Sequence, residues 1–466
     1  MILPLSSAAA LKGAHVTAFS SETTIDTSLD ISPDIRAGRL TSVQYAHNFA
    51  DATPPLTASQ AMLEAERCLY CFDAPCQQAC PTDIDVPSFI KRIADGNLRG
   101  AARTILESNP LGGMCARVCP TEVLCEQVCV RNTQQDQPIA IGRLQRHAVD
   151  ALMHSEQPQL FTRAAPTGKR IAVVGSGPAG LACAHTLARL GHDVVIHEAR
   201  PKAGGLNEYG LASYKTTGDF AQQELDWLLA IGGISIAHGW HFTGGGSLKA
   251  LSSSFDAVFL GLGLSTVAAL NIPGEALSGV RSAVDFIAEL RQSPDVATLP
   301  IGRRVVVIGG GMTAVDAAVQ AKLLGAQTVH LVYRRGPESM SASKAEQDWA
   351  LTHGVNIHHG LSPQEILGVD GSVAAVKFTR VDSSTETFDA DMVFKAIGQK
   401  TDSGVLADTG LMLTSGRIAT DKAGKTNLPS VWAGGDCRAG GQDLTVEAVD
   451  HGKRSAYAIH HTFAAY

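Results

Sequence analysis

The 466-residue sequence lacks any apolar run of the roughly 18 to 20 residues that a membrane-spanning helix needs. Its N-terminus lacks the charged and then apolar order of a secretory signal, because no basic residue precedes Lys12. A basic excess is also missing, since 38 Lys and Arg face 45 Asp and Glu, for a net charge of −7. We therefore expect a cytoplasmic protein that binds neither membranes nor nucleic acid.

Cysteine is scarce over most of the chain and dense in one short segment. Eight of the ten cysteines lie within residues 68–129, and only Cys183 and Cys437 lie elsewhere. In a reducing compartment, such a cluster is more typical of metal or iron–sulfur ligation than of disulfides. The spacings C-x2-C-x4-C-x3-C-P and C-x3-C-P-x4-C-x3-C contain only one C-x2-C pair. Iron–sulfur ligation is therefore favoured over structural zinc, which would usually use two such pairs.

A strand, a glycine-rich loop and a helix occur twice after residue 170, about 134 residues apart, which predicts two dinucleotide-binding domains. Before them, residues 1–55 are polar and predict an extended arm packed on something larger. Apolar residues at helical spacing follow, with Ser59 as the expected cap of the first helix, and predict a small all-α domain.

The first glycine loop, G-S-G-P-A-G at 175–180, follows a predicted strand at 171–174. Its glycines allow a tight turn, close approach of a pyrophosphate and close packing of the next helix, whose free N–H groups attract phosphate. Glu198 ends the next strand, where it can accept hydrogen bonds from ribose hydroxyls. The residues assigned to this nucleotide are Gly175, Ser176, Gly177, Pro178, Ala179, Gly180, Glu198, Gly205 and Leu206.

The second loop, G-G-G-M-T-A at 309–314, precedes a strand that ends in two arginines instead of an acid. Arginine binds a 2′-phosphate by charge-assisted hydrogen bonds, whereas a carboxylate repels it. This pattern favours NADP(H), although NADH and a merely solvated basic turn stay open. The residues assigned to this second nucleotide are Gly309, Gly310, Gly311, Met312, Thr313, Arg334 and Arg335.

Two dinucleotide domains in one chain usually hold one tightly bound flavin and one exchanging nicotinamide. The run G-G-D at 434–436 resembles the third FAD motif of the two-dinucleotide-binding-domain flavoproteins. That resemblance assigns Gly435 and Asp436 to FAD, with Asp436 holding a ribitol hydroxyl. Cys183 and Cys437 have no partner close in sequence to make a reactive dithiol, so both are expected to be buried structural thiols. Lys215 is a candidate flavin contact but is more typical of a solvated lysine.

The cysteine segment carries a more specific resemblance. The runs R-C-L-Y-C-F-D-A-P-C-Q-Q-A-C-P at 67–81 and C-A-R-V-C-P-T at 115–121 are similar to the N-terminal half of dihydropyrimidine dehydrogenase and its bacterial electron-input subunits. The glutamate synthase small subunit is a related family. The resemblance implies two [4Fe–4S] clusters, one held by Cys68, Cys71, Cys76 and Cys129 and the other by Cys80, Cys119, Cys125 and Gln145. Gln145 favours the pyrimidine family, because the glutamate synthase subunit tends to carry glutamate there. Cys115 is its rival, because thiolate is the more usual iron ligand.

The resemblance also implies a reaction and a partner. NAD(P)H, an exchanging cosubstrate, is oxidised at FAD, and electrons pass through the clusters to an FMN-containing catalytic subunit that reduces uracil or thymine. Hydride transfer requires no general acid or base, so no catalytic side chain is assigned. The alternatives are a glutamate synthase small subunit, a stand-alone NAD(P)H:acceptor iron–sulfur flavoprotein, and a zinc-bound scaffold without enzyme activity. The expected fold class is α/β. We expect the arm at 1–55 and an α-helical iron–sulfur domain at 56–160, followed by two Rossmann-like domains. The FAD-binding domain is expected at 168–295 and 396–466, interrupted by the NAD(P)H-binding domain at 296–395.

Overall fold

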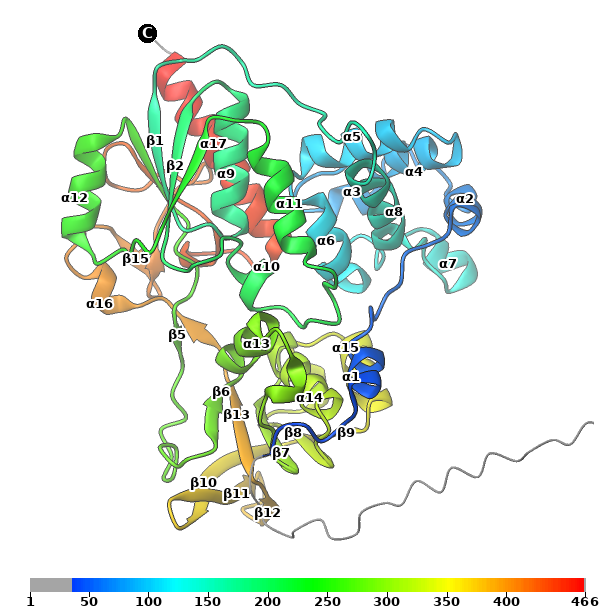
Figure 1. Cartoon of the computed structure of the whole chain (residues 1–466), viewed down its shortest axis with the longest axis vertical. Coiled ribbons are helices and arrows are strands. Elements are labelled where there is room, and N and C mark those ends of the chain that lie inside the picture. Colours follow the sequence, from blue (N-terminus) through cyan, green and yellow to red (C-terminus); the bar gives the residue numbers. More distant parts are fainter. Residues whose placement is uncertain (1–35, 465–466) are drawn as a thin grey trace, which may run out of the picture. The chain divides into compact units, whose positions relative to one another are not determined.

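The computed structural model describes residues 36–464, which lie within one compact unit (Figure 1). Residues 1–35 of the predicted arm lie outside the described residues. The rest of the arm contains helix α1 (Ser42–Asn48), which begins after a capping box formed by Thr41 and Gln44. Tyr45 of α1 is buried among residues of the second α/β domain described below. This part of the arm is therefore packed against the rest of the unit, but the prediction that it is extended is wrong at α1, which is helical.

A helical domain follows the arm and carries the eight clustered cysteines. Its elements are α2 (Ala58–Glu66), α3 (Pro75–Gln78), α4 (Val86–Ala94), α5 (Leu98–Ser108), α6 (Gly112–Val118), η1 (Thr121–Val123), α7 (Arg131–Gln135) and α8 (Ile141–Met153). Phe89 and Ile90 of α4 are buried, as the helical spacing of apolar residues predicted. The predicted cap Ser59 is wrong: Thr57 caps α2, because its hydroxyl and the Gln60 side chain form a reciprocal capping box.

The first α/β domain is built on a parallel sheet with the strand order β17-β4-β1-β2-β3. The strands are β1 (Arg170–Val174), β2 (Asp193–Glu198), β3 (Ile234–His238), β4 (Ala257–Leu260) and β17 (Val431–Ala433). Its helices are α9 (Pro178–Arg189), α10 (Leu206–Tyr209), α11 (Phe220–Leu229), α12 (Gly245–Ser254) and α17 (Thr445–Ala464). Helices α9 and α17 lie side by side (Figure 1), so closely that a Cβ on Gly452 would come within 2.1 Å of the Ala179 carbonyl oxygen.

The second α/β domain is built on another parallel sheet, ordered β6-β13-β7-β8-β9. Its strands are β6 (Val280–Ser282), β7 (Arg304–Gly309), β8 (Thr328–Tyr333), β9 (Val355–His359) and β13 (Met392–Ala396), with helices α13 (Ala283–Gln292), α14 (Met312–Leu323) and α15 (Lys344–Thr352). An antiparallel sheet of β10 (Leu361–Val369), β11 (Ser372–Arg380) and β12 (Thr385–Asp389) adjoins it. Because β6 pairs with β13, this sheet includes residues before 296, the predicted start of the NAD(P)H domain.

The second α/β domain interrupts the first. Strand β17 returns to pair with β4, which lies more than 170 residues earlier in the chain. The two crossings between the domains pair as the short antiparallel strands β5 (Thr266–Val267) and β14 (Gln399–Lys400). The remaining short elements are η2 (Val296–Thr298), η3 (Pro337–Ser339), α16 (Ser403–Leu406), β15 (Leu413–Thr414), β16 (Arg417–Ile418) and η4 (Gly435–Cys437).

The predicted fold class is confirmed: an α/β chain in which a small helical domain precedes two Rossmann-like domains. The central strand of each parallel sheet, β1 or β7, is apolar and buried after its first residue, as expected for sheets covered on both faces. Across residues 36–464, none of the helices combines the length and the apolar character needed to cross a membrane.

Candidate functional site

The first glycine loop joins β1 to α9 in the geometry that its sequence predicts. A Cβ on Gly180 would lie 1.9 Å from the Gly175 carbonyl oxygen, so only glycine lets α9 start this close to the strand end. Gly177 is the N-cap of α9 and supplies no side chain to the helix's free N–H groups, and Pro178 follows at the first turn. These N–H groups are therefore free to bind an anion such as a pyrophosphate.

Glu198 lies at the end of β2, beside the first loop. Its Oε2 accepts a hydrogen bond of 2.9 Å from the Ser176 backbone N–H and another from the Ser176 hydroxyl, and its Oε1 accepts one of 2.7 Å from the Arg200 N–H. Gly205, just before Leu206 and α10, has its backbone in close contact with Gly177. The structure thus brings the loop, Glu198 and the Gly205 segment together, as a single nucleotide site requires.

Gly435 and Asp436 reach the same place from the end of the chain. Gly435 follows β17 and packs against Ala179 in the first turn of α9. Burial and the neighbouring carboxylate of Asp443 raise the pKa of Asp436 to about 7. Among the described residues, the Asp436 carboxyl group has no hydrogen-bond partner. A half-buried, unpaired carboxyl beside the nucleotide loop fits the predicted contact with a sugar-alcohol hydroxyl of FAD.

The second glycine loop occupies the equivalent place in the second α/β domain. A Cβ on Gly309 would lie 2.3 Å from the Ala396 carbonyl oxygen, so the end of β7, like the first glycine loop, has no room for a side chain. Gly311 is the N-cap of α14, and Met312 and Thr313 form its first turn. The carbonyl oxygen of Gly310 accepts a 3.0 Å hydrogen bond from the Ala342 N–H, so a following loop covers this one.

Arg334 and Arg335 directly follow β8 and are exposed. Neither guanidinium forms an ion pair with the residues that the structure describes. The Arg335 guanidinium lies 5.5 Å from the centre of the Tyr333 ring. Both are free to bind a phosphate, but their selectivity for NADP(H) stays a prediction.

The first predicted set of cluster ligands converges on one pocket. Cys68 and Cys71 come from the loop between α2 and α3, Cys76 from α3 itself and Cys129 from the segment before α7, and all four line this pocket. Burial, helped by the neighbouring Cys68, raises the pKa of the Cys76 thiol to about 11. Four thiols around one pocket fit the ligand set of a cubane cluster.

The second predicted set also gathers in one region. A hydrogen bond with Cys115, burial and the neighbouring thiols of Cys125 and Cys80 all raise the pKa of the Cys119 thiol. Cys80, Cys119 and Cys125 are therefore close neighbours, with Cys115 beside them. Within residues 36–464, no group of three or more His, Cys, Asp or Glu side chains is arranged to hold a single metal ion.

Gln145 and Cys115, the rivals for the eighth ligand, lie on the packed helices α8 and α6. Gln145 is only 7% exposed and donates a 2.6 Å hydrogen bond to the Gly112 carbonyl oxygen, so it is not a surface amide. Cys115 is 2% exposed. Both candidates are internal, and the choice between them stays a prediction.

Two family models match the chain. The model described as pyridine nucleotide-disulphide oxidoreductase matches residues 169–452, and the model described as dihydropyrimidine dehydrogenase domain II, 4Fe-4S cluster, matches residues 45–157. The NAD-dependent dihydropyrimidine dehydrogenase subunit PreT of Salmonella typhimurium is 36% identical over 416 residues, which cover 89% of this chain and 97% of that protein. The chain belongs to the PreT family. It is therefore an FAD- and iron–sulfur-dependent NAD(P)H oxidoreductase.

The PreT family has relatives with other named activities. The glutamate synthase [NADPH] small chain of Escherichia coli K12 is 31% identical over 444 residues, covering 88% of this chain and 93% of that protein. Among solved structures, thioredoxin reductase of Lactococcus lactis matches with a TM-score of 0.52 at 20% identity, over 64% of this chain and all of that one. At that identity the match shows the shared fold and nothing about the substrate.

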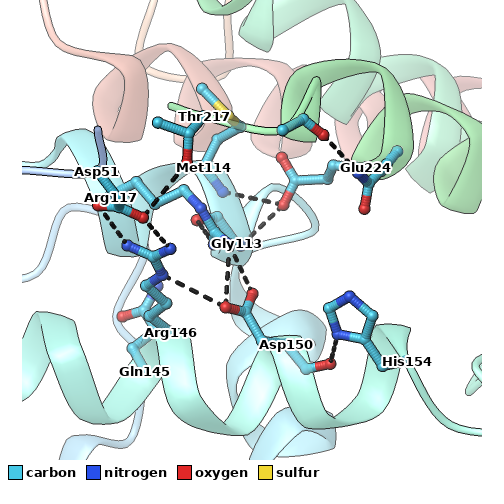
Figure 2. Close-up of polar contacts among 12 residues, drawn as sticks. Asp51, Gly113, Met114, Arg117, Gln145, Arg146, Asp150, His154, Thr217 and Glu224 are labelled. Carbon is cyan, nitrogen blue, oxygen red and sulfur yellow. Dashed lines mark hydrogen bonds and ion pairs between the residues drawn. The ribbon is translucent and has the colours of Figure 1, made fainter. Parts of the chain in front are cut away.

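Two buried charged residues in this PreT family member were not predicted from the sequence. Lys215 is not a solvated lysine, because its ammonium group is buried between Asp316 and Glu346. Glu224 of α11 is buried as well, and its Oε1 accepts hydrogen bonds of 2.8 and 3.1 Å from the backbone N–H groups of Gly113 and Met114 (Figure 2). Burial raises the pKa of Glu224 to about 8.

Glu224 joins the first α/β domain to the helical domain at α6, the helix that carries Cys115. Beside it, a chain of ion pairs runs from Arg117 of α6 through Asp150 and Arg146 of α8 to Asp51 of the arm (Figure 2). Arg117 binds both Asp150 carboxylate oxygens, at 2.8 and 3.0 Å. Only the Arg146–Asp150 pair, four residues apart on α8, has a local spacing that the sequence could show. The partners in the other contacts lie far apart in the sequence.

Proposed function

We propose that this chain is the electron-input subunit of a heteromeric dihydropyrimidine dehydrogenase. In this proposal it oxidises NAD(P)H at FAD and delivers the two electrons, through two [4Fe–4S] clusters, to an FMN-containing partner subunit that reduces uracil or thymine to the 5,6-dihydropyrimidine. The observation that carries it is the internal Gln145, which is hydrogen-bonded to the start of α6, the helix whose C-cap is Cys119, within a segment matched by the dihydropyrimidine dehydrogenase cluster model. The PreT relatives, which are named as dihydropyrimidine dehydrogenase subunits, support the same assignment.

The residues divide into binding roles. The 175–180 loop and the start of α9 would hold the FAD pyrophosphate, Glu198 the adenosine ribose and Asp436 the ribitol. The 309–313 segment would hold the nicotinamide nucleotide, with Arg334 and Arg335 at its adenosine end. When bound, FAD accepts a hydride from the nicotinamide, and the iron–sulfur clusters carry single electrons.

The two cysteine sets differ in what surrounds them. Lys453 of α17, in the first α/β domain, donates a 2.6 Å hydrogen bond to the Ser108 carbonyl oxygen and lies close enough to Cys80 for their charges to interact. The second set therefore faces the flavin-binding domain. The first set lies beneath the exposed loop that carries Leu69, Tyr70 and Phe72, in which Phe72 is 100% exposed.

We infer that the partner subunit contacts this loop. Exposed aromatic side chains are frequent anchors of protein interfaces, and an acceptor must come close to the electron-carrying site that it serves. A partner seated at Phe72 would receive electrons from the first set, while the second set stays on the flavin side.

The decisive experiment reconstitutes the complete reaction. The purified chain is expected to contain about eight iron and eight sulfide per FAD, and to reduce uracil with NADH or NADPH once a candidate FMN subunit is added. Separate assays with NADH and NADPH settle the coenzyme, for which the two arginines favour NADPH although the PreT relatives are named NAD-dependent. Copurification with a partner that lacks FMN, together with no uracil reduction, would overturn the proposal.

The glutamate synthase small subunit is the second candidate, because of the 31% identity to that protein. It predicts a large glutamine-processing partner and NADPH-dependent glutamate formation by the complex. The identity of the copurifying subunit separates the two. A cytoplasmic location remains a prediction from the sequence.

A further inference from the structure

Lys215 lies where three parts of the molecule meet. It belongs to the segment between α10 and α11 of the first α/β domain, and its Nζ lies 2.8 Å from Asp316 Oδ1 and 2.7 Å from Glu346 Oε1. The Lys215 side chain is only 16% exposed. The preceding Tyr214 is buried in the core of the second α/β domain, and its hydroxyl donates a 3.2 Å hydrogen bond to the same Asp316 oxygen.

The two carboxylates come from helices that flank the nicotinamide loop. Asp316 lies on α14, the helix that starts at the second glycine loop. Glu346 lies in the first turn of α15, whose N-cap, Ser343, donates a hydrogen bond to Glu122 of the helical domain. Lys215 therefore links the first α/β domain to the second, at a helix that is itself bonded to the helical domain.

This arrangement is sensitive to the angle between the two α/β domains. A buried ammonium group is tolerated only when opposite charges compensate for its lost hydration. Burial lowers the pKa of Lys215, but the charges of Asp316 and Glu346 outweigh that effect and raise it. Rotation of the second domain would withdraw both carboxylates from Lys215 at once, leaving three poorly solvated charges without partners.

The described part of the arm spans the same junction. Asn48 of α1 donates a 2.9 Å hydrogen bond to the Leu323 carbonyl oxygen at the end of α14. A few residues later, the Ala52 N–H donates a 2.9 Å hydrogen bond to the Tyr214 carbonyl oxygen, and Asp51 pairs with Arg146 of the helical domain. The arm thus ties the end of α14 to the residue next to Lys215.

We propose that Lys215 is a positioning residue for hydride transfer, which fixes the angle of the second α/β domain to the first and, with it, the placement of the nicotinamide loop relative to the flavin loop. This role rests on the proposed function only for the FAD and NAD(P)H sites, and does not depend on a pyrimidine-reducing partner. Lys215 itself takes no part in the chemistry.

The test uses the purified full-length chain with its cofactors and the substitution Lys215→Met, which removes the charge and keeps an unbranched side chain. The rate of flavin bleaching by saturating NAD(P)H is measured by stopped-flow absorbance near 450 nm. Since a misplacement of about 1 Å can cost roughly a hundredfold in rate, we expect a decrease of at least about tenfold. The dissociation constant of the oxidised nicotinamide should change by less than about twofold, because no residue of the second glycine loop is altered. Lys215→Arg should restore part of the rate.

A second readout does not involve turnover. Backbone amide hydrogen exchange in α15 and in residues 212–217 should be faster in Lys215→Met than in the parent before any NAD(P)H is added. The matched control is Lys344→Met, which removes an exposed lysine from the same helix α15 and should leave both the bleaching rate and the exchange unchanged.

A Lys215→Met protein with the parental bleaching rate and exchange would overturn the role. If that variant loses FAD or aggregates, Glu346→Gln takes its place. That variant keeps the contact of Lys215 with Asp316, so it should also lower the bleaching rate, but by a smaller factor. A parental bleaching rate would again overturn the role. Failure to reduce uracil would defeat the proposed function without affecting this comparison of bleaching rates.

Discussion

The substitution Gly180→Ala should weaken FAD binding through a single methyl group. The added Cβ would lie 1.9 Å from the Gly175 carbonyl oxygen, whereas real Cβ contacts stay beyond 3.0 Å, so α9 must move by about 1.1 Å from the strand end. Overpacking of this kind costs about 1 to 3 kcal/mol. If that cost falls wholly on the FAD-bound state, the dissociation constant of FAD rises roughly fivefold to 150-fold.

The assay is a titration of deflavinated protein with FAD, followed by the quenching of flavin fluorescence. Gly246→Ala provides the matched control, because Gly246 also lies near the start of a helix, α12, and a Cβ there meets nothing within 4 Å. That variant should bind FAD like the parent and gain up to about 1 kcal/mol of helix stability. Equal FAD affinity of Gly180→Ala and the parent would refute the idea that close packing of α9 builds the site.

Three further predictions concern the helical domain and its contact with the first α/β domain. The pKa of Glu224 is raised from 4.5 to about 8, so the buried carboxylate lowers the stability of the fold as the pH rises from about 4.5 towards 8. Glu224→Gln should therefore reduce the fall in melting temperature between pH 5.5 and pH 8. An unchanged fall would contradict the pKa shift. If Gln145 is the eighth ligand, Gln145→Ala should lose iron and Cys115→Ala should retain about eight iron per chain; the reverse pattern would assign Cys115. Phe72→Ser should weaken binding of the proposed FMN subunit at least about tenfold in a pull-down or titration, as truncation of an anchor residue does. Val381→Ser, at a 95% exposed position in the second α/β domain, should not weaken it, and equal affinities of the two variants would place the partner contact elsewhere.

The parts of the site that were predictable are encoded locally. The glycine loop at 175–180 and Glu198 lie in one strand–helix–strand unit, so spacing along the chain fixes their spacing in space. The spacing of the cysteines favoured iron–sulfur ligation, and the family resemblance that their runs carry implied the division into two sets. The cap of α2 was predictable too: Thr57 followed by Gln60 is a capping-box pattern, and the choice of Ser59 overlooked it.

The parts that were not predictable depend on contacts between distant segments. Lys215 pairs with Asp316 and Glu346, which are 101 and 131 residues further along the chain, and the sequence near Lys215 does not predict these partners. Strand β6 is three residues long and joins the second sheet only by pairing with β13. A strand that short carries too little periodicity to be assigned to one sheet over another.

The charges at the domain junctions serve geometry more than stability. Replacing a buried ion pair by apolar residues is often neutral or stabilising, whereas removing one partner leaves a costly unpaired charge. An apolar interface between the α/β domains could tolerate small rotations, since hydrophobic contact is not directional. The contact of Lys215 with its two carboxylates tolerates few such rotations, because the distances from its Nζ to Asp316 and to Glu346 must both stay near 2.8 Å. A chain in which a nicotinamide must meet a flavin, and electrons must then reach a separate helical domain, gains from a junction that fixes angles. The arm follows the same reasoning. Ala52 bonds to the junction between the α/β domains, and the adjacent Asp51 bonds to the ion-pair chain of the helical domain, so two neighbouring residues hold both parts in one arrangement.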